Sequence, residues 1–288
     1  MKKGNIKSKI LPIATMISPV TLWLMILIVI PFIYVMVISF CKVDSNYNIV
    51  FEFTLKNYKN MLDPSYLQIY GNSLLIAFLT TLICLFLGYP FAFFISRVFE
   101  KQKAILYMIV IVPFWTNSLI RIYGWRTFLG ANGWLNKAIM AIGISHEPVE
   151  FLFTRGAVIL GMVYALFPFM VLPLYTAIEK LDQNLLEASS DLGAKNFKTL
   201  IHVILPLTTS GIFSGAIMVF IPTLGFFFVS NILGGGNSQM IGNLIERQFQ
   251  SGNNWPLGAA LSIVLIMITL LLVRVYQKLG GDLESLGV

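Results

Sequence analysis

The residues best suited to chemistry with a partner lie in one short segment. It reads Glu187-Ala188-Ser189, then Gly193, then Leu205-Pro206. A carboxylate such as that of Glu187 forms charge-assisted hydrogen bonds with an arginine or lysine of another protein. Small side chains let a helix enter a groove, and glycine readily takes the left-handed backbone that turns one short helix into the next. The spacing predicts a docking element, the other interpretation being a solvated amphipathic loop with a capping glycine.

Catalytic and cofactor-binding arrangements are missing from the sequence. It has no nucleophile with its base and no paired catalytic acids. Gly234-Gly235-Gly236 lacks the Lys-Ser/Thr that follows in a phosphate-binding loop. His146 lies near Glu147 and Glu150, which is a weak metal signal. We therefore expect neither an enzyme nor a resident metal or cofactor.

Composition places the chain in a lipid bilayer. Of its 288 residues 57% are hydrophobic and only 11% are charged, against about 25% charged residues in a soluble protein. The net charge of +7 comes from cations scattered over loops and termini, which excludes nucleic acid as a partner. Cys41 and Cys84 have the spacing of neither a metal site nor a disulfide framework. We expect an all-α integral membrane protein in contact with membrane lipid.

Long uncharged runs predict about six membrane-spanning helices, because about 20 apolar residues cross the hydrocarbon. The runs are 10–41, 64–96, 104–120, 156–178, 199–245 and 251–273, and the glycines at 234–236 end the fifth span early. The first run is much longer than the apolar part of a cleaved signal, so we interpret it as a retained span. With neither a repeat nor a linker, the chain is expected to form a single domain, 1–288.

The cations of the loops predict the orientation. Lysines precede the first span, and others fill the loops after the second and fourth spans: Arg97, Lys101, Lys103, Lys180, Lys195 and Lys198. Loops rich in cations stay in the cytoplasm. Both termini and the loop at about 180–200 are therefore expected to be cytoplasmic.

Two further patterns concern local shape. An apolar stripe after Gly133 predicts a short amphipathic helix at the outer interface or an ordinary packed loop helix; its residues are Trp134, Leu135, Ala138, Ile139 and Ile142. Prolines within the spans predict kinks; they are Pro31, Pro90, Pro113, Pro168, Pro173 and Pro222.

The segment around Glu187 resembles the EAA loop of ABC-importer permeases. The family pattern is E-A-A, three residues, G, nine residues and I-x-L-P, and this chain departs from it only at Ser189 and Val203. The resemblance implies the type I importer permease (MetI-like) fold, with a loop that docks on a cytoplasmic ATPase and conveys its closure to the pore. It assigns this contact to Glu187, Ala188, Ser189, Asp191, Leu192, Gly193, Ala194 and Pro206.

Motifs elsewhere are similar to those of the spermidine/putrescine permease group of that family. They lie at 87–92, 112–124, 172–175, 178–182, 241–243 and 255–260. The resemblance implies a polyamine importer of the bacterial cytoplasmic membrane that works by alternating access. Its implied partners are a paralogous permease, two ATPase subunits that use ATP and Mg²⁺, and an extracytoplasmic polyamine-binding protein that docks on the outer loops.

A polyamine path should offer aromatic faces and oxygen acceptors. The predicted spans contain no carboxylates, so selectivity would rest with the binding protein or with the second permease. The candidate path residues are Trp115, Asn117, Tyr164, Phe169, Phe226, Phe227 and Asn231. If Phe226–Phe228 follow one helix, successive steps of about 100° point them in different directions. Arg121 is interpreted as structural, because a cation repels a polyamine.

Other functions are compatible with parts of these patterns. An importer permease for an inorganic anion or ferric ion would share the same loop. A membrane enzyme is a distant alternative because catalytic constellations are missing, and a non-transporting scaffold is equally distant.

Overall fold

The computed structural model describes residues 6–278, with the side chains of residues 17–278 other than 100 and 183. The regular secondary structure of the described residues is helical apart from one antiparallel hairpin of two short strands. Its first half contains α1 (Ile6–Ser39), β1 (Lys42–Val43), β2 (Ile49–Val50), α2 (Lys56–Asn60), α3 (Pro64–Arg97), α4 (Glu100–Ile111), the 3₁₀-helix η1 (Val112–Trp115), α5 (Ser118–Leu129) and α6 (Trp134–Ala141). The second half contains α7 (Arg155–Glu179), α8 (Gln183–Asp191), α9 (Asn196–Thr199), the π-helix η2 (Leu200–Ile204), α10 (Leu205–Leu207), α11 (Thr209–Gly225), α12 (Phe227–Gly234), α13 (Ile241–Gln250) and α14 (Trp255–Lys278).

The lengths and hydropathy of these helices match a membrane protein. Four helices are long and apolar enough to cross a bilayer, namely Ile17–Ser39 within α1, α3, α7 and α14. Two further pairs of bent helices pass the same test together, which brings the number of spans to six if each pair crosses once. The predicted all-α membrane class with about six spans is confirmed.

The third predicted span is broken. The helical segments 101–115 and 118–141 meet at an angle of 95°. Thr116 has an extended backbone, and the side-chain oxygen of Asn117 accepts a hydrogen bond from Leu119 N, which begins α5 anew. An asparagine cap satisfies a backbone donor that a new helix otherwise leaves without a partner. The predicted span 104–120 is therefore not one continuous helix, and the break lies at Thr116 and Asn117, just after the kink predicted at Pro113.

The fifth predicted span is interrupted twice. A bend of 69° separates Asn196–Leu207 from Thr209–Gly225, and α11 then ends before Phe226. Phe226 has a ψ of 59°, outside the helical range. The three consecutive phenylalanines thus do not follow one helix, because Phe226 lies in the break and the next two begin α12.

The described residues fall into two compact units. One comprises the chain up to Leu62 with Arg247–Leu265, and the other comprises Asp63–Glu246 with the chain from Ile266. The single-domain expectation for 1–288 stays a prediction.

In the first unit, the end of α1 is held by the segment that follows it. Asn57 Nδ2 donates to the carbonyl oxygens of Ser39 (3.0 Å) and Cys41 (2.9 Å), and Phe40 stacks on Phe53 with 5.5 Å between ring centroids. Buried polar groups need such partners. The loop after α1 is therefore a folded cap on the helix end.

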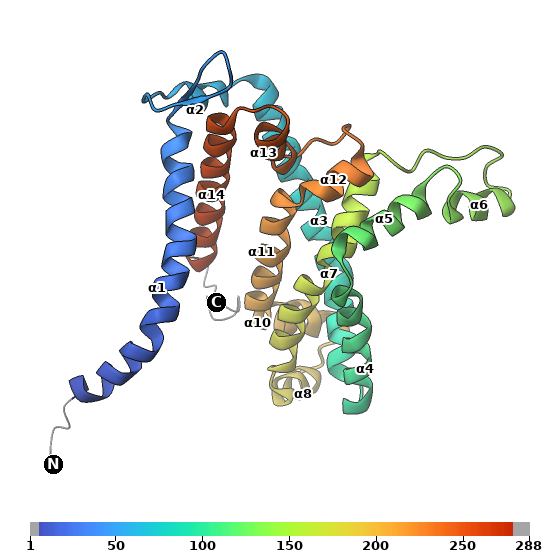
Figure 1. Ribbon diagram of the computed structural model, residues 1–288. Helices are drawn as coiled ribbons and strands as arrows, with labels where there is room; N and C mark the ends of the chain where they lie inside the picture. The colour runs from blue at the N-terminus through green and yellow to red at the C-terminus, as the bar shows by residue number, and fades with distance from the viewer. Residues whose placement is uncertain (1–5, 279–288) are drawn as a thin grey trace. The chain divides into compact units, whose positions relative to one another are not determined.

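The second unit is built around α3, α7 and α11, which pack together (Figure 1). Their shared core includes Ala92, Leu166, Met170, Leu174 and Val219, all fully buried. Glycines allow the close approach: a Cβ on Gly211 would lie 2.5 Å from Ala177 Cβ, and one on Gly215 would lie 2.7 Å from Met170 Sδ. Small residues at helix contacts are typical of membrane bundles.

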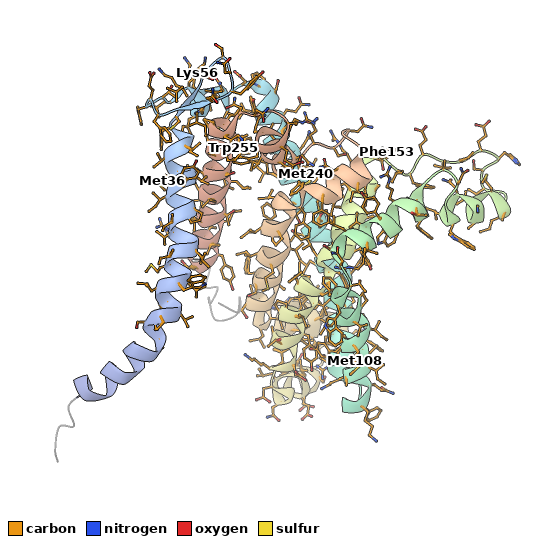
Figure 2. The ribbon with its side chains drawn as sticks, viewed as in Figure 1. Met36, Lys56, Met108, Phe153, Met240 and Trp255 are labelled. Carbon is orange, nitrogen blue, oxygen red and sulfur yellow. The ribbon has the colours of Figure 1, made fainter. Side chains whose placement is uncertain are left out.

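A second apolar cluster joins the beginning of α7 to α5 and α12. Its fully buried members include Ile122, Val158, Met162, Leu233 and Met240. Phe153 N, in the loop before α7, donates to the carbonyl oxygen of Leu233 at 2.8 Å, and Figure 2 places Phe153 and Met240 on either side of α12. This cluster fixes α12 beside the broken third span.

Candidate coupling loop and substrate path

The candidate coupling loop consists of α8, α9, η2 and α10. Asp182 caps α8, because its side chain accepts a hydrogen bond from Asn184 N at 2.9 Å. Glu187 and Asp191 lie on α8 with exposed side chains and make no ion pair with the described residues. Both carboxylates are available to cations of another protein.

Gly193 ends α8 in the left-handed conformation, as the sequence predicts. Its φ is +79°, Gly193 N donates to Ser190 O at 2.9 Å, and Ala194 N donates to Ser189 O at 3.1 Å. This pair of bonds is the Schellman motif, in which glycine has no Cβ to strain. The turn sends the chain from α8 into α9.

A pair of hydroxyls holds the two sides of this turn together. Ser189 Oγ lies 2.8 Å from Thr199 Oγ1, and both side chains are buried. The EAA pattern has an alanine at the position of Ser189, and an alanine has no hydroxyl to form this hydrogen bond. The sequence contained no signal that these two residues meet.

One face of the loop is an open apolar groove of about 650 Å³. Five of the eight predicted contact residues line it: Ala188, Ser189, Leu192, Ala194 and Pro206. Leu192 is 88% exposed and Phe197, elsewhere on the loop, is 71% exposed. A docking surface typically combines exposed apolar side chains with nearby carboxylates that have no partner within the chain, as this loop does.

Other residues of the loop border a second groove, toward the end of α3. Its volume is about 760 Å³, and it is lined by Tyr89, Pro90, Phe93 and Arg97 of α3 and by Leu186, Ser190, Asn196, Phe197, Thr199, Leu200 and Ile204 of the loop. The loop therefore does not pack tightly against α3 along this groove.

A buried hydrogen bond connects the loop's exit to α3 at the rim of this groove. Thr208, at the 69° bend, donates to Ile204 O at 2.8 Å, and Tyr89 Oη lies 2.9 Å from Thr208 Oγ1. The π-helix η2 lies one short helix, α10, before the bend, and such wide turns are frequent at functional sites. Tyr89 belongs to a motif noted in the sequence, but its link to Thr208 was not foreseen.

A charged contact joins α4 to α7 in the same unit. Lys103 Nζ lies 3.1 Å from Glu179 Oε1, and the Tyr175 hydroxyl also donates to this oxygen. An ion pair that is partly shielded at one end contributes modestly to stability. The ion pair connects the beginning of α4 to the end of α7, which directly precedes the loop.

Several candidate path residues surround the break between η1 and α5. Trp115 is 83% exposed, and Asn117 is exposed while its Oδ1 caps α5. Phe169 packs edge-on to Phe114 with centroids 6.0 Å apart. Tyr164 packs against Trp125 at 5.5 Å.

Arg121 lies in the middle of these aromatics. Its Cζ is 4.4 Å from the centroid of Phe114 and 5.6 Å from that of Tyr164. Its Nε and Nη1 are buried and have no hydrogen-bond acceptor among the described residues. The sequence grouped the aromatics as one path but did not place this cation between them.

The remaining candidates lie at the break between α11 and α12. Phe226 packs on Phe228 at 5.2 Å. Asn231 is exposed, and its Oδ1 accepts a hydrogen bond from Asn243 Nδ2 at 2.7 Å, which also donates to Phe227 O at 2.9 Å. These residues form a contact cluster at the beginning of α12. The amide oxygen expected to face a cation is already engaged by Asn243.

His146, Glu147 and Glu150 are exposed in the loop after α6. No group of three or more His, Cys, Asp or Glu side chains in the described part of the chain is arranged to hold a metal ion.

Sequence comparisons identify the family. The model of the binding-protein-dependent transport system inner membrane component matches residues 8–280. The spermidine/putrescine transport system permease protein PotB of Haemophilus influenzae is 45% identical over 278 residues, covering 96% of each chain. The protein of the same name from Escherichia coli K12 is 45% identical over 263 residues, covering 91% of this chain and 96% of its own.

Solved structures agree on the fold. A chain in the crystal structure of a bacterial alginate ABC transporter, in complex with its alginate-bound periplasmic protein, superposes with a TM-score of 0.75. The identity is 19%, covering 94% of this chain and 96% of that one. The fold is therefore that of an ABC-transporter permease, and the chain belongs to the family of binding-protein-dependent transport system inner membrane components.

Proposed function

We propose that this chain is one of two permease subunits of an ATP-driven importer for polyamines of the spermidine and putrescine class. The observation that carries the proposal is the 45% identity to permeases of that name over nearly the whole chain. A second, independent support is the exposed coupling loop, with its acidic, small and apolar side chains.

ATP hydrolysis is assigned to partner subunits. The importer would contain two cytoplasmic ATPases that use ATP and Mg²⁺. One of them would bind the groove face of α8–α10 of this chain, with Glu187 and Asp191 facing its cationic side chains and Leu192 entering an apolar pocket. Such a contact combines apolar burial with charge complementarity. Closure of the ATPases would then move the loop and, through the bend at Thr208, α11.

The orientation follows from that assignment. The loop and both termini would lie in the cytoplasm, in agreement with the lysines and arginines at 97–103 and 180–198. The membrane would be the bacterial cytoplasmic membrane. An extracytoplasmic polyamine-binding protein would deliver its cargo to the outer loops, and a paralogous permease would complete the pore.

Substrate recognition within this chain would rest on aromatic faces and amide oxygens. The two clusters, around Trp115, Tyr164 and Phe169 and around Phe227 and Asn231, offer both. Ammonium groups bind to such faces by cation–π attraction. Carboxylates would come from the paralogous permease or from the binding protein.

Uptake by the reconstituted complex tests the proposal. The chain, its paralogue, the ATPases and the binding protein are placed in proteoliposomes, and ATP-dependent uptake of radiolabelled spermidine is measured against competing putrescine, sulfate, phosphate and ferric ion. Uptake inhibited by putrescine alone supports a polyamine importer. Absence of spermidine uptake, with ATP-dependent uptake of one of the inorganic ions, contradicts it and favours the related importers.

A further inference from the structure

Arg121 combines three features that a structural arginine avoids. Its guanidinium carries two buried donors, Nε and Nη1, without an acceptor among the described residues. It lies one turn into α5, close to the end where the helix dipole is positive and repels a cation. It forms no ion pair with the described residues. Buried charges normally have a partner, so an unusual site is indicated.

The only partners that the described residues offer to this cation are aromatic faces. The rings of Phe114 and Tyr164 lie within the range of cation–π attraction, at 4.4 and 5.6 Å from Cζ. Each ring is itself fixed by another aromatic, Phe114 by Phe169 and Tyr164 by Trp125. The two rings therefore form a pre-organised cage for an organic cation.

We infer that Phe114 and Tyr164 are an ammonium-binding cage that Arg121 occupies in the conformation described, so that substrate ammonium and guanidinium compete for it. The inference rests on the proposed function, since it names a subsite for the cationic substrate of this permease. An alkylammonium group enters when Arg121 swings out, and Arg121 returns when the ammonium moves on.

The surroundings fit an exchange of this kind. Trp115, Asn117 and Tyr123 are exposed around the same break in the chain, so an incoming cation meets open aromatic and polar groups there. Nε and Nη1 of the guanidinium form no hydrogen bond with the described residues, so movement of Arg121 out of the cage breaks none at these two atoms.

Binding of choline and its neutral isostere 3,3-dimethylbutan-1-ol to the assembled transporter, without binding protein, tests the cage. The two probes have the same shape and differ in charge. If the cage is vacant in about one molecule in ten, removing the competitor strengthens binding about tenfold. We therefore expect Arg121→Leu to lower the Kd for choline and for spermidine about tenfold, and choline to bind more tightly than the neutral alcohol, which gains no cation–π attraction in the vacated cage.

Three variants separate the cage from other effects. Arg126→Leu removes an exposed charge from the same helix and should change the Kd less than twofold. Arg121→Lys keeps a cation and should behave as the wild type. Adding Phe114→Leu to Arg121→Leu should abolish the gain. A gain that survives the loss of Phe114, or an Arg121→Leu variant that binds choline no better than the wild type, overturns the inference.

A measurement on the unaltered protein does not depend on how the variants fold. Saturating choline should make Arg121 react faster with phenylglyoxal, measured by mass spectrometry, because the ammonium displaces it from the cage. The reactivity of Arg126 should stay constant. Protection of Arg121 by choline, or an unchanged rate, contradicts the exchange.

The outcomes distinguish this inference from the proposed function. Choline displacement of Arg121 in a complex that does not import spermidine supports the cage and refutes the polyamine importer. Spermidine import with no effect of choline on Arg121 supports the polyamine importer and refutes the cage.

Discussion

The hydroxyl groups of Tyr89 and Thr208 are hydrogen-bonded across 2.9 Å between α3 and the bend that follows the coupling loop. Both side chains are buried. The groove of about 760 Å³ beside them separates much of the loop from α3, so this bond is a firm polar connection where the packing is loose. A movement of the loop is therefore expected to reach the bundle through this point.

Replacing Tyr89 by phenylalanine should uncouple ATP hydrolysis from transport. Thr208 keeps its bond to Ile204 O, so only one neutral hydrogen bond is lost, about 0.5–1.5 kcal/mol. That amount changes a two-state equilibrium roughly twofold to tenfold. We expect the molecules imported per ATP to fall by such a factor, measured in proteoliposomes with ATPase assembly unchanged.

The chain supplies a matched control for this variant. Tyr276 Oη and Ser214 Oγ form a buried bond of the same kind, 2.8 Å long, between α14 and α11 away from the bend. Tyr276→Phe should leave the ratio of transport to ATP hydrolysis unchanged. An equal effect of both substitutions would show general loosening rather than a role for Tyr89.

Gly193 should tolerate asparagine better than valine. A Cβ at this position meets nothing within 4 Å, so the cost of substitution comes from the positive φ alone, about 1–2 kcal/mol for an ordinary residue. We expect Gly193→Val to weaken binding of the ATPase subunits roughly tenfold and Gly193→Asn to retain most of it, measured by surface plasmon resonance. Gly71→Ala, at an equally open position without a positive φ, should bind as the wild type.

Leu192→Asn should separate docking from folding. The side chain is 88% exposed, and changes at exposed sites usually alter stability by less than about 0.5 kcal/mol. Burial of a leucine in an ATPase pocket contributes about 1.5–3 kcal/mol. The melting temperature of the purified permease should therefore stay constant while its affinity for the ATPase falls at least tenfold. A constant affinity would place the contact elsewhere.

The Ser189–Thr199 pair should show energetic coupling. Removing either hydroxyl leaves the other buried without its present partner, which costs about 1–3 kcal/mol, whereas removing both costs less than the sum. The cycle of Ser189→Ala, Thr199→Val and the double variant should give a coupling energy of about 1 kcal/mol in denaturant unfolding. Strict additivity would mean that the hydroxyls contribute independently.

Asn231→Asp should improve polyamine import. An aspartate still accepts the hydrogen bond from Asn243 Nδ2, so the local structure is kept while a negative charge is added near the path. We expect the KM for spermidine to fall severalfold at low ionic strength, and less at high salt because exposed charges are screened. A KM that is independent of both the substitution and the salt would remove Asn231 from the path.

Much of this protein is determined by local pattern. The uncharged runs predicted helices of membrane length, because in a bilayer a single segment can pair its backbone N–H and C=O groups only by forming a helix. Gly193 and the residues around it specified a helix end and a turn, because the left-handed conformation is a property of the residue itself. The apolar stripe from Trp134 likewise predicted α6.

The tertiary structure decided where the spans break and which side chains meet. The breaks at Asn117, Thr208 and Phe226 depend on caps and packing from other helices, which uncharged runs do not reveal. Arg121 between Phe114 and Tyr164, and Tyr89 with Thr208, join residues 7, 43 and 119 positions apart. Such contacts arise only when helices pack, because their energy depends on distance in space and not on spacing along the chain.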